Sequence, residues 1–283
     1  MTARSLSDER RPTETFPIPA RGLIRTARGF RRTVLGLLRE LGRRVYYAIA
    51  LGRALGEPRT WGGETVRQMY YMGVGSLPLV VIVAGFLGAV TAFQTFYQLF
   101  GGVQNSVVGL ISRQSIVLEL GPLLTGLTLT GRVGARMTAE IGTMRVTEQI
   151  DALETLAYDP VAFLGLPRVL AALIMLPTLT MIADVVAILS AWATLVLATD
   201  VTSSEFVDGL RLAFTPFQVV YSMIKALCYG AAISFVCSFE GYTTTAGAEG
   251  VGRATAKAVV IASVAILVLD AVVAAIFAPL IQA

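Results

Sequence analysis

The amino-acid sequence predicts an all-α integral membrane protein, in which an N-terminal interfacial amphipathic helix precedes five transmembrane helices. Of its 283 residues, 55% are hydrophobic and only 15% are charged, whereas a soluble domain has about 25% charged residues. The charges are also clustered, and residues 68–112 contain no Asp, Glu, Lys or Arg. Because about 20 consecutive apolar residues can cross a bilayer, such stretches indicate a chain that lies largely in lipid.

Basic residues are concentrated before the first apolar span. Residues 1–72 contain 14 Arg and 6 acidic residues, whereas the remainder contains 9 basic and 13 acidic residues. Basic residues beside a span usually stay on the cytoplasmic side, so the N-terminus is predicted to be cytoplasmic. A nucleic-acid-binding arm is the alternative. It is disfavoured, and no nucleic-acid partner is expected, because the arginines adjoin a span and no aromatic stacking pattern accompanies them.

The segment before the spans divides into two parts. Residues 1–20 are polar and contain three prolines, a composition typical of a disordered tail. Residues 21–72 form a basic region whose amphipathic helix covers about 21–50 and is too charged to span. We predict that this helix lies in the headgroup plane; the alternative is a soluble helix docked on a cytoplasmic partner. The arginines expected to face anionic lipid include Arg25, Arg28, Arg32 and Arg39.

Five apolar spans follow in a predicted membrane domain, residues 73–283. Pro177 is expected to kink the third span. Cys228 and Cys237 lie nine residues apart in the fourth span; they are interpreted as core residues because this separation along a helix is too great for a disulfide. Five spans after a cytoplasmic N-terminus place the C-terminus outside. The spans cover about residues 76–96, 114–131, 169–198, 217–239 and 258–280.

Ionisable residues occur inside four of these spans, namely Glu119, Asp184, Lys225 and Asp270. A charge at the bilayer centre costs about 2.5–3.5 kcal/mol on insertion scales. Such residues therefore face a bundle interior, a polar cavity or an opposite charge, and Lys225 is expected to pair with one of the three acids. For Glu119 and Lys225 a buried ion pair and a cavity lining for a headgroup both stay open. Asp184 is interpreted as structural.

The segment between spans two and three, residues 131–168, is too polar to cross a membrane and contains few turn signals. Apolar residues recur there at approximate helical spacing, and acidic residues occupy the other faces. We predict short cytoplasmic helices on the membrane face, which can anchor to lipid or dock on a soluble partner. The acidic surface favours a protein partner.

The residues of this segment also carry a resemblance to a known family. The run GRVGARMTAEIGTMRVTEQIDALETLAYDP, together with LELGPLL, LPRVLA, IKALCYG, FEGYTTTAGAEGVGRATAKAVV and LVLDAV in the same order, closely resembles the MlaE/YrbE permeases. Members of this family are the membrane subunits of ABC transporters that move lipids with MCE-domain proteins. The resemblance covers about residues 25–280.

The resemblance implies a homodimer in the bacterial inner membrane that moves phospholipids or related lipids. A cytoplasmic ABC ATPase, which would use ATP and Mg, and an extracytoplasmic MCE-domain hexamer would be its partners. Glu119, Lys225 and Asp270 match family positions at the lipid cavity, and Leu118 stands where some relatives have an arginine that could contact a headgroup. The cytoplasmic helix would be the coupling helix, with ATPase contacts at Thr147, Glu148, Gln149, Asp151 and Glu154.

Several residue types and motifs are missing from the sequence, and their absence excludes some classes of function. The sequence contains no His, which excludes imidazole catalysis and His metal ligation, and no GxxxxGK[ST] phosphate loop for ATP. We therefore expect no catalytic residue, metal or cofactor in this chain. An ion-coupled secondary carrier that uses Glu119, Asp184 and Asp270 as proton sites is the alternative function. A membrane-embedded enzyme acting on lipid has the least support, since no activated nucleophile is apparent.

Overall fold

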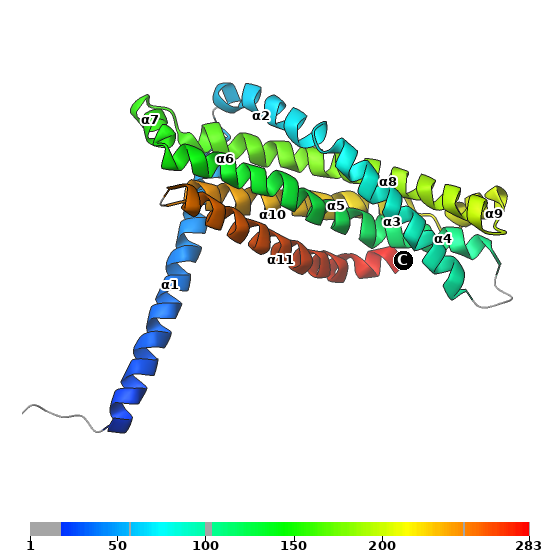
Figure 1. Ribbon diagram of the computed structural model, residues 1–283, viewed down its shortest axis with the longest axis horizontal. Coiled ribbons are helices and arrows are strands. Elements are labelled where there is room, and N and C mark those ends of the chain that lie inside the picture. Colours follow the sequence, from blue (N-terminus) through cyan, green and yellow to red (C-terminus); the bar gives the residue numbers. More distant parts are fainter. Residues whose placement is uncertain (1–17, 57, 100–103, 246, 283) are drawn as a thin grey trace, which may run out of the picture. The chain divides into compact units, whose positions relative to one another are not determined.

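The computed structural model describes residues 18–56, 58–99, 104–245 and 247–282, and these are helical apart from short connections (Figure 1). The π-helical turns η1 (Ile116–Leu120), η2 (Thr130–Gly134) and η3 (Val161–Gly165) interrupt the α-helices. Five helical stretches in the described residues are long and apolar enough to cross a membrane, as predicted. The α-helices are α1 (Ile18–Ala54), α2 (Pro58–Gly73), α3 (Leu77–Gln98), α4 (Ser106–Ser115), α5 (Gly121–Leu129), α6 (Ala135–Val146), α7 (Gln149–Thr155), α8 (Leu166–Ala198), α9 (Ser203–Arg211), α10 (Pro216–Tyr242) and α11 (Gly247–Gln282).

The chain forms two compact units, Met1–Tyr46 and Tyr47–Ala283. In the first unit, α1 begins at Ile18, so the end of the predicted tail is helical, and residues 1–17 lie outside the described part of the chain. Arg39 is exposed on this helix. The side chains of Arg25, Arg28 and Arg32 lie outside the described residues, and their contact with lipid stays a prediction.

The second unit is a helical bundle built around α8, which packs against α2, α3 and α10, while α6 and α10 pack against α11. Small residues allow α3 to approach α8 closely. Ala84 and Ala92 are buried, and a Cβ added to Gly88 would lie 1.9 Å from the carbonyl oxygen of Ala187. Pro177 lies inside α8. Figure 1 shows α7 at one end of this bundle and α4 with α9 at the other.

The helix that contains the second span is longer than predicted. Helices α4 to α6, with the turns η1 and η2, form one continuous stretch, Ser106–Val146. The prediction that residues 132–146 form separate helices on the membrane face was therefore wrong. Gly134 does not end the helix; it permits close packing, because a Cβ there would lie 2.8 Å from the Sγ of Cys237 on α10. Only α7 remains as the short helix expected between spans two and three.

The segment between the third and fourth predicted spans contains the helix α9. Its first turn is a capping box, in which Glu205 N donates to Thr202 Oγ1 at 3.3 Å and Thr202 N donates to Glu205 Oε2 at 2.8 Å. The hydrogen bond from the Thr202 backbone, with that from its side chain, lowers the pKa of the Glu205 carboxyl. The Thr-x-x-Glu pattern is a signal that could have identified this helix from the sequence.

Candidate functional site

A cluster of three charged side chains joins three of the predicted spans. Lys225 lies on α10, Glu119 in the turn η1 and Asp270 on α11. Lys225 Nζ lies 2.5 Å from Glu119 Oε2 and 2.7 Å from Asp270 Oδ1. Lys225 therefore pairs with two of the three acids considered in the sequence, and the residues that the family resemblance assigns to a lipid cavity lie together.

Pro122 explains why Lys225 also contacts the backbone. In a regular α-helix the N–H of residue 122 would donate to the carbonyl of residue 118, but proline has no N–H. The Leu118 carbonyl accepts a hydrogen bond from Lys225 Nζ at 3.1 Å instead. It lies in the π-turn that is closed by a hydrogen bond from Gly121 N to Ile116 O. Since an ammonium has three N–H donors, this carbonyl and the two carboxylates satisfy all of them.

Two tyrosines on α10 complete the cluster, and neither was predicted from the sequence as a site residue. The Tyr229 hydroxyl donates to Asp270 Oδ1 at 2.5 Å, and the Tyr221 ring centroid lies 4.9 Å from Lys225 Nζ. Both tyrosines are four residues from Lys225, so one face of α10 carries all three side chains. That spacing, around a charge inside a span, was the available signal.

Exposure differs sharply among the three charged residues. The side chain of Lys225 is 0% exposed, that of Asp270 is 20% exposed and that of Glu119 is 47% exposed. Two carboxylates and one ammonium give the cluster a formal charge of −1. The ion pairs can hold η1, α10 and α11 together, and the Glu119 carboxylate at the surface can attract a polar or cationic group.

Asp184 does not join this cluster. Its Oδ2 accepts a hydrogen bond from Ser222 Oγ at 3.0 Å, and its Oδ1 would lie 1.8 Å from a Cβ added to Gly121. Within the described part of the chain Oδ1 has no hydrogen-bond partner. The residue is buried where α8 meets the start of α5, and its structural role stays a prediction.

The predicted coupling residues lie at and beside α7, and all five are exposed. Glu148 ends the preceding helix with a left-handed backbone, φ 59°, which turns the chain into α7. Ile150 is 0% exposed and anchors α7 in the core. Asp151 Oδ1 pairs with Arg145 Nη1 at 2.6 Å. The guanidinium of Arg145 also lies over the Tyr242 ring, 5.9 Å from its centroid, so α7 is tied to α6 and to the end of α10.

An apolar groove of about 270 Å³ lies beside the acidic surface of α7. Met144, Leu153 and Phe163 form part of its wall, and Leu156 at its edge is 69% exposed. An exposed apolar patch rimmed by polar residues is typical of a surface that binds a protein partner. The acidic residues of this surface were predictable from the sequence, but the groove was not, because it requires η3 to pack beside α7.

Comparisons with known proteins match the region that contains both sites. The family described as Permease MlaE matches residues 65–276. A "Probable ABC transporter permease protein" of Rickettsia bellii is 34% identical over 255 residues, which cover 90% of this chain and 98% of that protein. The "Intermembrane phospholipid transport system permease protein MlaE" of Haemophilus influenzae is 31% identical over 251 residues, 87% of this chain and 94% of that protein. "Protein TRIGALACTOSYLDIACYLGLYCEROL 1, chloroplastic" of Arabidopsis thaliana is 33% identical over 214 residues, 76% of this chain and 61% of that protein. Since the family match covers most of the chain, the Lys225 cluster and α7 included, the chain belongs to the MlaE permease family.

Proposed function

We propose that this chain is the permease subunit of an ABC transporter that moves phospholipids or related lipids between the inner membrane and an MCE-domain partner. The observation that carries the proposal is the Lys225 cluster, a charged group within membrane-spanning helices that opens to the surface at Glu119. The Haemophilus influenzae relative is named for phospholipid transport and the Rickettsia bellii relative as an ABC transporter permease. A permease of this kind acts as a transporter subunit and leaves ATP hydrolysis, with its Mg, to a separate cytoplasmic ATPase.

In this proposal α7 is the ATPase contact and α10 transmits its movement. The Arg145 side chain connects Asp151 on α7 with Tyr242 at the end of α10. Lys225 lies 17 residues earlier on α10, or about 25 Å along the helix axis at 1.5 Å per residue. A displacement of α7 by the ATPase would therefore move the helix that carries the centre of the cluster, and so change access to Glu119.

The proposed homodimer would enclose the lipid with faces that a single chain leaves uncovered. Large apolar side chains are exposed on α3 and α11, among them Phe86, Val90, Val260 and Val264. Acyl chains or a second copy of the chain can cover such faces, since lipid and protein are similarly apolar there. The headgroup would lie near Glu119, and an MCE-domain hexamer would receive the lipid at the end of the bundle opposite α7.

Charge reversal on α7 tests the coupling role. Glu148→Lys combined with Glu154→Lys reverses two exposed carboxylates and should lower lipid transfer and lipid-stimulated ATPase activity at least about fivefold, because charge complementarity at an interface is lost. Asp151 is left unchanged, since its reversal would break the ion pair with Arg145. Asp208→Lys reverses one exposed carboxylate on α9, at the other end of the bundle, and is the control for ATPase binding and ATPase activity. Full activity and normal assembly of the double variant would show that α7 is not the ATPase contact.

Purification tests the partners directly. The chain is isolated in mild detergent, and the proteins and lipids that accompany it are identified by mass spectrometry. An ATPase, an MCE-domain protein and phospholipid in one particle are the expected result. Isolation of the folded chain from its native membrane with neither protein would contradict the proposal.

An ion-coupled carrier remains the second candidate, and the Asp184 Oδ1 atom, which lacks a hydrogen-bond partner in the described residues, favours it. The purified chain in liposomes, with a proton gradient and no ATPase, separates the two functions. Substrate accumulation under those conditions would support the carrier and contradict the ABC permease.

A further inference from the structure

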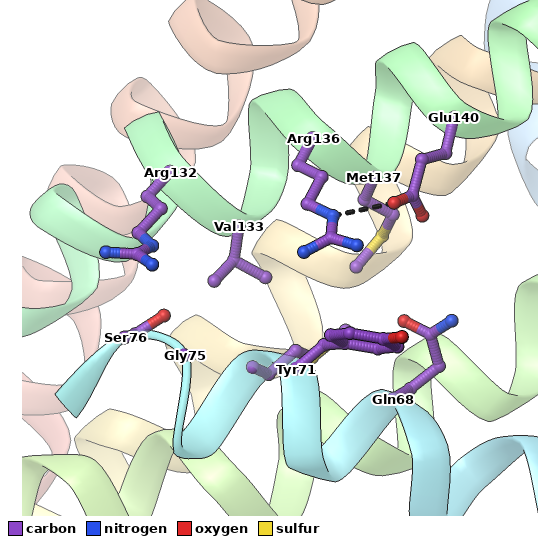
Figure 2. Close-up of a pocket in the computed structure, with 10 residues that line it drawn as sticks. Gln68, Tyr71, Gly75, Ser76, Arg132, Val133, Arg136, Met137 and Glu140 are labelled. Atoms are coloured by element: carbon purple, nitrogen blue, oxygen red, sulfur yellow. Dashed lines mark hydrogen bonds and ion pairs between the residues drawn. The ribbon is translucent and has the colours of Figure 1, made fainter.

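A polar cavity of about 70 Å³ lies between the connection from α2 to α3 and the second span (Figure 2). A buried water needs about 10–15 Å³, so the cavity is large enough for a small polyatomic group. It shares no residue with the Lys225 cluster. The polar residues that line it are Gln68, Tyr71, Ser76, Arg132, Arg136 and Glu140.

Helix lengths place this cavity at a membrane boundary. Helix α3 starts at Leu77 and has 22 residues, about 33 Å at 1.5 Å per residue, which matches the hydrocarbon thickness of about 30 Å. In the second span Arg132 is the first charged residue after Glu119, 13 residues and about 20 Å further along the helix. Both helices therefore place the cavity at headgroup depth, on the side of the bundle that carries α7.

The cavity has a cation available for a ligand. Arg132 is exposed, and no ion pair or hydrogen bond of its side chain is found within the described ranges. A Cβ added to Gly75 would lie 3.9 Å from Arg132 Nη2, so the guanidinium reaches the α2–α3 connection. In Figure 2 the Arg132 side chain extends from its helix toward Ser76 and Gly75.

A second arginine on the same wall is held in place by its neighbours. Arg136 lies over the Tyr71 ring, 4.7 Å from the centroid, and its Nε donates to Glu140 Oε1 at 2.6 Å. Glu140 also lies 3.5 Å from Arg168 Nη2, so one carboxylate serves two guanidinium groups. The wall of the cavity is therefore positively charged overall.

A buried hydroxyl points into the same space. Ser76 is 0% exposed, and its Oγ has no hydrogen-bond partner among the residues that the structure describes. Figure 2 shows this oxygen directed from the α2–α3 connection toward the helix of Arg132 and Val133. Buried hydroxyls are normally hydrogen-bonded. The Ser76 hydroxyl and the Arg132 guanidinium face the same cavity, and neither has a hydrogen-bond partner among the described residues.

We propose that this cavity binds a phosphate group, with Arg132 as its main cation and the Ser76 hydroxyl as a hydrogen-bond donor. Charge-assisted hydrogen bonds from Arg suit phosphate oxygens. The group comes either from the headgroup of an anionic phospholipid in the adjoining leaflet or from free phosphate, which offer the same oxygens. Bound there, it would link α2 and α3 to the second span, and the site does not depend on the proposed transport function.

Two binding measurements on the full chain test the proposal and separate the two sources. In nanodiscs of phosphatidylcholine with increasing phosphatidylglycerol, native mass spectrometry counts the anionic lipids that the chain retains. In nanodiscs of phosphatidylcholine alone, isothermal titration measures the affinity for inorganic phosphate. Arg132→Gln should weaken binding about tenfold and Ser76→Ala about threefold, in line with a charged and a neutral hydrogen bond. Arg211→Gln, an exposed arginine on α9, is the control with the same change in net charge.

Retention of phosphatidylglycerol that depends on Arg132 and resists inorganic phosphate would identify a lipid headgroup. Binding of inorganic phosphate that depends on Arg132 would identify free phosphate, and either result supports the site. Equal losses in Arg132→Gln and Arg211→Gln would overturn it, because the attraction would then be general. So would binding that neither Arg132→Gln nor Ser76→Ala changes.

Discussion

Replacement of Lys225 by methionine tests whether the charged cluster holds the bundle together. Met has a similar length and no charge, so the substitution removes the ion pairs while it leaves little empty space. Glu119 and Asp270 would then face each other without a cation, and the Leu118 carbonyl would lose its donor. We expect a clear loss of stability.

The size of that loss follows from the exposure of the two carboxylates. Removal of one partner from a buried ion pair costs about 3–5 kcal/mol. Water can screen Glu119, which is 47% exposed, but screens Asp270 less, at 20%. The expected loss is therefore near the lower limit, about 3 kcal/mol. At about 2–4 °C per kcal/mol for a chain of this size, the melting temperature should fall by about 6–12 °C.

Thermal unfolding in detergent can be followed with a thiol-reactive dye, because Cys237 is 0% exposed and reacts only when α10 unpacks. Cys228, which is partly exposed, is replaced by Ser in every sample. The matched variant is Lys225→Met with Asp270→Asn, which removes one unpaired charge and keeps an acceptor for Tyr229. It should recover most of the lost stability. A double variant that melts no higher than Lys225→Met, or a single variant that melts like the parent, would refute the electrostatic explanation.

Two further substitutions test packing and burial. Gly88→Ala should lower stability by about 1–3 kcal/mol, since its Cβ would overlap the Ala187 carbonyl, whereas Gly85→Ala, with nothing within 4 Å, should melt like the parent in the same thermal assay. Burial raises the pKa of Tyr47 from 10.0 to about 12. The neutral phenol therefore stabilises the folded state fully below pH 10, and this contribution is lost as the pH rises toward 12. Tyr47→Phe should abolish that part of the alkaline decline in melting temperature, and an unchanged decline would show that Tyr47 ionises freely.

The membrane spans could be predicted because lipid requires a run of residues without charge. The end of the helix that contains the second span could not be predicted. Hydropathy reports where lipid ends, but a helix ends only where its backbone hydrogen bonds stop, and those continue past Arg132 to Val146. The chain turns at Glu148, whose left-handed backbone has no strong sequence signal, since glutamate is not a usual residue for that conformation.

The candidate site was predictable in its chemistry and not in its geometry. A lone lysine among three intramembrane acids indicates an ion pair, but the choice of Glu119 and Asp270 over Asp184 depends on how the helices pack. Asp184 accepts a hydrogen bond from Ser222 and lies beside Gly121, and both residues are far from it in the sequence. The cavity at Ser76 was missed for the same reason, because its two walls come from separate helices.

The saturated ammonium of Lys225 has a consequence for any anion that reaches it. Its three donors already have acceptors supplied by the chain, so an arriving phosphate oxygen can bind only by substitution for one of them. Asp270 and Glu119 therefore compete with the ligand for Lys225. The binding free energy of the ligand is weakened by the free energy of the contact that it displaces. The same competition favours release of the ligand, because the displaced carboxylate stays close enough to bind Lys225 again as the ligand leaves.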